Sequence, residues 1–113
     1  MRVYIGCGIS TGPARAEAAR LADFATGLGI AVSGSGAAKD EQWLLNQDET
    51  ILEIRKAHAV VVVIDEELGW LEVGIATGVG IEPMFHDLRR GGPNSLEDIR
   101  VALQDLAAAP TPN

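Results

Sequence analysis

The sequence is poor in cysteine, in basic residues and in aromatic side chains. Cys7 is its single cysteine among 113 residues, so no intramolecular disulfide can form, and a cysteine-based metal cluster is disfavoured. Lysine and arginine total 9 against 16 acidic residues, which leaves a net charge of -7. Because phosphate recognition needs clusters of Lys and Arg, this balance argues against a nucleic-acid partner.

Long hydrophobic runs are also missing. The longest apolar run, residues 59–64, has six residues, whereas a membrane-spanning helix needs about 20. Met1 leads directly into a short strand-like segment, without the charged and then apolar stretches of a signal peptide. We therefore expect a cytoplasmic enzyme or binding module that has no membrane partner.

What the chain does contain is an alternation of strand-like and helix-like segments. Hydrophobic residues make up 47 % of it, which suffices for one packed core. The predicted strands are 3–6, 30–33, 59–64 and 81–86, and the predicted helices are 13–28, 39–57, 70–79 and 95–106, the last opened by a capping box at 94–97.

This alternation predicts one α/β domain, residues 1–106, followed by a flexible tail, 107–113. The expected architecture is a flavodoxin- or Rossmann-like parallel sheet of four or five strands, in the order 2-1-3-4, with helices on both faces. In such sheets a ligand lies beyond the carboxyl ends of the strands, where the strand order reverses. That point falls between the first and third strands, beside the loops 6–12 and 65–72.

The first of these loops is rich in glycine. Residues 6–12, GCGISTG, join a strand to a helix, and such turns let backbone N–H groups approach an anion or a sugar. The spacing is not that of a dinucleotide fingerprint, and no lysine follows as in nucleotide-binding loops. A tight turn between a strand and a helix accounts for these glycines equally well.

The second loop leads to Glu72, in the first turn of the predicted helix 70–79. A helix N-terminus favours a carboxylate and keeps it ionised, as a nucleophile or an electrostatic stabiliser requires. The alternative is that Glu72 only decorates the start of the helix, and that Asp65, Glu66 and Glu67 are solvated loop charges.

Three segments, taken in order, resemble the nucleoside 2-deoxyribosyltransferase family, which includes related deoxynucleoside monophosphate N-glycosidases. Residues 3–11, VYIGCGIST, are similar to the first strand and loop of that family. Residues 46–64 resemble its middle helix and third strand. Residues 69–76, GWLEVGIA, resemble its nucleophile segment, in which a glycine shortly precedes Glu-x-Gly-x-Ala.

The resemblance implies roles for individual residues. Glu72 matches the nucleophile, Tyr4 a tyrosine that holds the nucleophile in place, and Asp48 an acid that lines the pocket. From the residues alone, Tyr4 fits a core position and Asp48 a helix cap equally well. The implied substrate-binding residues are Gly6, Gly8, Ile9, Ser10, Asp65, Glu66, Gly69 and Trp70. The loop length leaves open which acid of 65–67 contacts the base or the sugar.

The chain also departs from the family pattern. The spacing from Gly69 to Glu72 is one residue shorter than is common, and Trp70-Leu71 replaces small residues there. Ser10-Thr11 stands where nucleotide hydrolases often carry an arginine, which favours nucleosides as substrates. The chain is short, so the candidates to complete a neighbouring subunit's pocket are His86, Asp87 and Asn94.

The implied function is cleavage of the N-glycosidic bond of (2-deoxy)ribonucleosides through a covalent glycosyl–Glu72 intermediate, with transfer of the deoxyribosyl group to another nucleobase. One alternative is a nucleoside or nucleoside 5′-monophosphate N-hydrolase, with water as the acceptor. Another is a non-catalytic nucleotide-binding module. We expect small-molecule nucleosides and nucleobases as partners, a homodimer or larger homo-oligomer, and no cofactor or metal.

Overall fold

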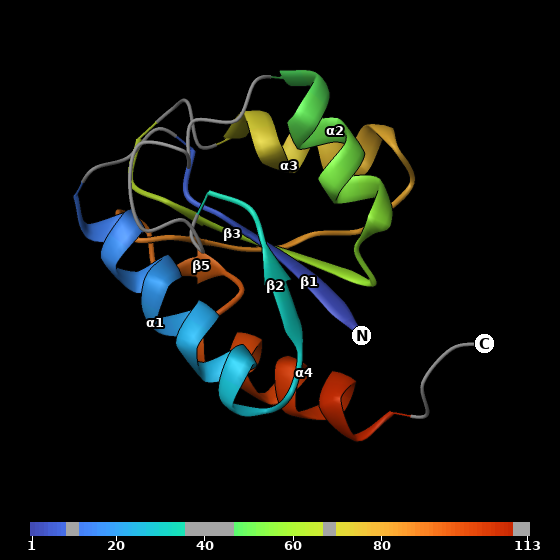
Figure 1. The fold of residues 1–113 in the computed structure, drawn as a ribbon. Coiled ribbons are helices and arrows are strands. Elements are labelled where there is room, and N and C mark those ends of the chain that lie inside the picture. The colour runs from blue at the N-terminus through green and yellow to red at the C-terminus, as the bar shows by residue number, and fades with distance from the viewer. Residues whose placement is uncertain (9–11, 36–46, 67–69, 110–113) are drawn as a thin grey trace.

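The computed structural model describes residues 1–8, 12–35, 47–66 and 70–109, which form one sheet with helices on both faces (Figure 1). The strands are β1 (Arg2–Gly6), β2 (Ala31–Ser33), β3 (Ala59–Ile64), β4 (Met84–Asp87) and β5 (Gly92–Pro93). Their order is β2-β1-β3-β4-β5, and the first four run parallel, while β5 is antiparallel to β4. The predicted α/β fold and its 2-1-3-4 strand order are confirmed.

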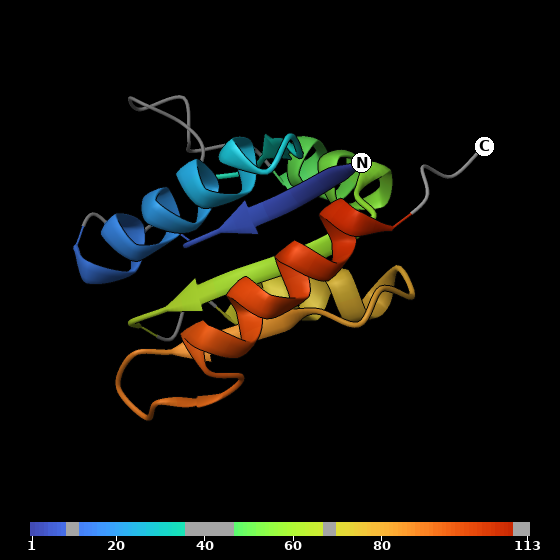
Figure 2. The same cartoon turned by 90° about the horizontal axis from the view of Figure 1, so that it is seen from below.

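Four helices form the two outer layers. They are α1 (Pro13–Gly27), α2 (Gln47–Lys56), α3 (Trp70–Gly78) and α4 (Leu96–Ala108). Helices α1 and α4 cover one face of the sheet, and α2 and α3 cover the other (Figures 1 and 2). In the described parts of the chain, no helix combines the length and the apolar character that crossing a membrane requires.

Strand β3 is buried on both sides, which explains its unbroken β-branched sequence. Val61 and Val63 pack in the core beneath α1 and α4. Val62 and Ile64 belong to the core beneath α2 and α3, together with Ile54. Because successive side chains of a strand point to opposite faces, a strand covered twice needs apolar residues at every position.

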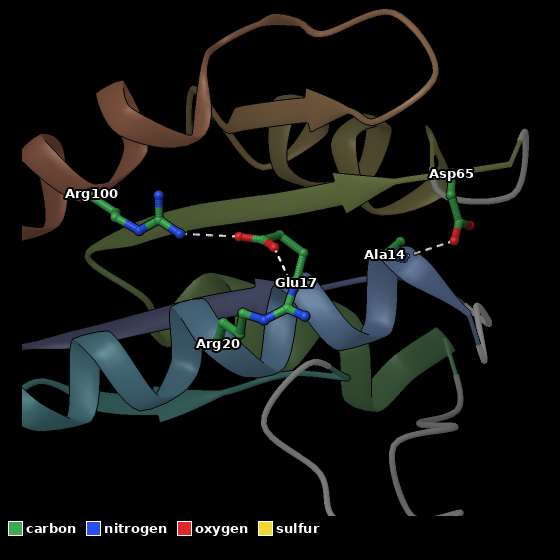
Figure 3. Close-up of polar contacts among 5 residues, drawn as sticks. All are labelled: Ala14, Glu17, Arg20, Asp65 and Arg100. Carbon is green, nitrogen blue, oxygen red and sulfur yellow. Dashed lines mark hydrogen bonds and ion pairs between the residues drawn. The ribbon is translucent and has the colours of Figure 1, made fainter.

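Helices α1 and α4 are joined by a buried acid. Glu17 on α1 accepts hydrogen bonds from Arg20 on the same helix, at 2.7 Å, and from Arg100 on α4, at 3.2 Å (Figure 3). Burial of a carboxylate is tolerated when charged donors replace the lost water. Glu17 therefore holds the two helices of this layer together.

The strand expected at 81–86 begins later, at Met84. Pro83 directly precedes it and has no N–H to donate to a neighbouring strand, so the ladder starts after the proline. The segment expected as a loop, 90–93, contains β5, in which Gly92 pairs with Asp87 and Pro93 with His86.

The end of the chain also differs from expectation. Ser95 caps α4 by accepting the N–H of Asp98 at 3.0 Å, one residue later than the predicted capping box. Asn94 instead accepts the N–H of Phe85 at 3.0 Å. Helix α4 continues to Ala108, so the first two residues of the expected tail are helical. Of the predicted helix 39–57, the part before residue 47 lies outside the described residues.

Candidate functional site

The site lies at the carboxyl ends of the adjacent strands β1 and β3. The chain leaves β1 toward α1 on one face of the sheet, and it leaves β3 toward α3 on the other face. This divergence makes the topological switch point at which open α/β sheets bind their ligands. The structure thus brings together the described ends of the two loops singled out in the sequence, residues 6–8 and 12 of the first and residues 65–66 and 70–72 of the second.

Glu72 lies at the centre of this site. It lies in the first turn of α3 and is only 5 % exposed. The hydroxyl of Tyr4 donates a hydrogen bond to its Oε2, and the backbone N–H of Gly8 donates to its Oε1 at 2.5 Å. Both oxygens are therefore held by β1 and the turn that follows it, 64 and 68 residues away in the sequence.

Gly6 makes room for this carboxylate. A Cβ atom at Gly6 would overlap Oε2 of Glu72 and would lie only 2.8 Å from Oε1. The carboxylate rests directly against the backbone of β1, where any side chain would displace it. Gly6, expected to bind substrate, therefore has a definite role as the surface on which Glu72 lies.

Gly8 contributes through its backbone conformation. Its φ of 61° lies in the left-handed region that residues with a Cβ rarely adopt. In this conformation its N–H points at Glu72. At Gly8 the backbone N–H of the glycine-rich turn therefore faces the protein's own carboxylate.

Tyr4 is a buried donor to Glu72. Burial raises the pKa of its hydroxyl far above the ordinary value, and the negative charge of Glu72 raises it further. A hydrogen bond from Thr50 on α2 lowers the pKa in part. Tyr4 therefore stays protonated and donates across the whole physiological range, and Thr50 joins α2 to the site, a contact that the sequence did not indicate.

The pKa of Glu72 is raised above its ordinary value. Burial is the largest cause, and the hydrogen bonds from Tyr4, Gly8 and Ser35 lower the pKa only in part. The start of a helix was expected to favour the ionised form, whereas the net shift of the pKa is toward the protonated form. Loss of water disfavours the charged form more than the donors favour it.

Ser35 is a site residue that sequence reasoning missed. It is buried in the turn after β2, where its Oγ accepts the N–H of Cys7 at 2.8 Å. Gly34, with φ of 102°, allows this turn to lie against the backbone of Ile5. Ser35 lies at the carboxyl end of β2, the strand beside β1, and this position could have identified it as a site residue.

Asp65, expected to contact base or sugar, is engaged with a helix end. Its Oδ2 accepts the backbone N–H of Ala14 at 2.8 Å (Figure 3). Gly12, the residue that precedes α1, has no side chain to cap the helix, so Asp65 supplies the acceptor and the negative charge that a helix N-terminus favours. Glu66 beside it is half-buried.

Two further predicted site residues lie apart from these hydrogen bonds. Trp70 packs edge-on against Phe85 of β4, with ring centroids 5.1 Å apart. Asp48 is exposed in the first turn of α2, where an acid suits the helix dipole. The predicted residues that the structure joins directly are Tyr4, Gly6, Gly8 and Glu72. Ile9, Ser10, Glu67 and Gly69 lie outside the described residues.

The three polar residues near β5 bond to partners close in sequence. Nδ1 of His86 lies 2.6 Å from the carbonyl oxygen of Asn94. Asp87 is buried and accepts a hydrogen bond from Arg89 at 2.8 Å, and this guanidinium lowers the pKa of Asp87 to about 2. These contacts hold the connection between β4 and β5.

Within the described ranges, no three His, Cys, Asp or Glu side chains are arranged to hold a metal ion. Cys7 is buried, and burial raises the pKa of its thiol. Comparisons with protein-family models, with curated proteins and with solved structures found no match. The function is therefore inferred from the geometry around Glu72.

Proposed function

We propose that this protein cleaves the N-glycosidic bond of (2-deoxy)ribonucleosides, with Glu72 as the nucleophile, and transfers the deoxyribosyl group to another nucleobase. The observation that carries the proposal is the position of Glu72. Its carboxylate is buried at the switch point of the sheet, lies against Gly6, and is held at both oxygens by Tyr4 and Gly8.

The proposed reaction has two displacements at C1′ of the sugar. In the first, a Glu72 oxygen bonds to C1′ while the C1′–N bond breaks, and the base leaves with the electron pair and takes a proton from water. In the second, a ring nitrogen of another base bonds to C1′ and gives its proton to the hydroxide left by the first step, while the bond between C1′ and the Glu72 oxygen breaks and restores the carboxylate. A carboxylate nucleophile thereby divides one difficult step into two easier ones.

Burial of Glu72 supports this role. An anion that has lost its water is held at a high free energy, which its raised pKa reflects. Formation of the glycosyl ester removes the negative charge, so the buried surroundings favour the covalent intermediate over the free carboxylate. The donors on Tyr4 and Gly8 fix the direction of the carboxylate before the substrate arrives.

The test is incubation of the protein with deoxyinosine, with and without adenine, and separation of the products by chromatography. New deoxyadenosine is the expected product. Free hypoxanthine without an added acceptor would show that water is the acceptor, which keeps Glu72 chemistry but replaces transfer by hydrolysis. Thermal stabilisation by nucleoside with no product would overturn the proposal in favour of a binding module.

A further inference from the structure

The buried carboxylates of the described chain differ in what balances their charge. Glu17, Glu72 and Asp87 are each at most 9 % exposed. Two arginines contact Glu17, at 2.7 and 3.2 Å, and Arg89 contacts Asp87 at 2.8 Å. Glu72, in contrast, forms no ion pair with any residue that the structure describes. Because buried charges are normally paired, the acid at the candidate site lacks a counter-ion that the other two possess.

The groups that donate to Glu72 are all neutral. They are the hydroxyls of Tyr4 and Ser35 and the backbone N–H of Gly8. Arg15 approaches from α1, but its guanidinium donates to the carbonyl oxygen of Ser35 at 3.4 Å and is not among the groups that shift the pKa of Glu72. Neutral donors orient a carboxylate without cancelling its charge. A positive charge beside Glu72 would therefore be attracted strongly, since buried surroundings screen charges less than water does.

We propose that the substrate supplies this positive charge, and that it is a (2-deoxy)ribonucleoside whose base is a cationic heteroaromatic ring, such as a pyridinium or an N7-alkylated purine. This inference rests on the proposed function and names its substrate class. Glu72 lies at the switch point of the sheet, where a ligand can meet it, whereas Glu17 and Asp87 are balanced within the chain. Asp65 and Glu66 follow β3 at the same edge, and their negative charge also favours a cation.

A cationic base simplifies the first displacement. An oxygen of Glu72 bonds to C1′, the C1′–N bond breaks, and the electron pair of that bond stays on the base, which leaves as a neutral molecule. The negative charge of the carboxylate and the positive charge of the base disappear together, and no proton is transferred. A neutral purine or pyrimidine would leave as an anion and need a proton. Because burial disfavours charge, the surroundings of Glu72 favour the step that removes two charges.

Two ligands that cannot be cleaved test the preference for a cation. The first, 1-methylnicotinamide, carries the pyridinium charge, and nicotinamide is the same ring without it. Calorimetry should show that the wild-type protein binds the cation about tenfold or more tightly, because opposite charges attract at a buried site. Glu72→Gln should remove this preference. Asp23→Asn is the matched control, since it removes one negative charge from an exposed position on α1, and it should leave the preference unchanged.

Cleavage assays separate this inference from the proposed function. Nicotinamide riboside, in which a pyridinium nitrogen is bonded to C1′, should release nicotinamide with the wild-type protein and not with a folded Glu72→Gln variant. Equal binding of the two ligands, or a preference that Glu72→Gln retains, would overturn the cationic substrate class. Cleavage of deoxyinosine without cleavage of nicotinamide riboside would also overturn it, while upholding the proposed function. A preference that depends on Glu72, with neither nucleoside cleaved, would overturn the proposed function and leave a cation-binding site.

Discussion

At the scale of single residues, Glu72 owes its position to groups that the sequence places far from it. Gly6 leaves the space that the carboxylate fills, Gly8 turns its N–H toward it, and Tyr4 donates to its second oxygen. Ser35 adds a donor from a third segment. A buried acid with this many donors and a raised pKa is the kind of group that functional sites contain.

Replacing Glu72 by Gln tests the nucleophile while keeping its shape. The amide oxygen can accept from Gly8, and the amide nitrogen can donate to the hydroxyl of Tyr4, so the fold should persist. Turnover of deoxyinosine should fall by about 10³-fold or more, because an amide cannot form the ester. Chromatographic rates measure the loss, and wild-type rates in a folded variant would refute the assignment.

A methyl group at residue 6 tests the position of the carboxylate. Gly6→Ala forces Glu72 away from β1, because the added Cβ would overlap its oxygens. We expect turnover to fall by at least about 10²-fold, as displacements of about 1 Å cost that much in active sites. Gly27→Ala is the matched control, since nothing lies within 4 Å of a Cβ there, and its activity should remain unchanged.

At the scale of elements, β3 was the most precisely predicted strand. The buried β3 was located to the residue from its unbroken apolar run, because a strand covered on both faces has no polar positions. The start of β4 and the pairing of β5 were not located from the sequence. Both depend on which strand lies beside the backbone at Pro83 and at Gly92–Pro93. The capping role of Asp65 likewise depends on how α1 is placed beside β3.

The link between α1 and α4 through Glu17 gives a prediction about stability. Glu17→Ala removes the acceptor for Arg20 and Arg100, and it should lower the free energy of unfolding by about 1–3 kcal/mol. Urea denaturation followed by circular dichroism measures this change. Asp23→Ala, at an exposed position on the same helix, is the control and should change stability by less than about 0.5 kcal/mol. Equal effects at the two positions would contradict the role given to Glu17.

At the scale of the whole molecule, Glu72 and Asp87 make stability depend on pH in opposite senses. Glu72 has a raised pKa in the folded protein, so its contribution is greatest when it is protonated, and stability falls as pH rises above its ordinary value of 4.5. Asp87 has a pKa lowered to about 2, so its contribution is present above about pH 4 and is lost as pH falls toward 2.

Thermal unfolding of two variants over a range of pH measures these effects separately. Glu72→Gln should have a higher Tm than wild type at neutral pH, and the difference should vanish near pH 3, where Glu72 is protonated. Asp87→Asn should have a lower Tm than wild type at neutral pH, and this difference should shrink as pH falls through the range from about 4 to 2. A Glu72→Gln variant less stable than wild type at neutral pH would contradict the conclusion that burial of the ionised Glu72 carboxylate destabilises the fold.

The sequence by itself determined the class of the fold and the strand order, because hydrophobic periodicity and strand–helix alternation restrict a short chain to few topologies. It also placed Glu72 at the start of a helix. Only the tertiary structure decided that Gly6 and Gly8 receive that carboxylate, that Ser35 and Thr50 join the site, and that Asp65 caps α1. The reason is physical: hydrogen bonds, overlap and loss of water depend on distances between segments, which no local pattern of residues encodes.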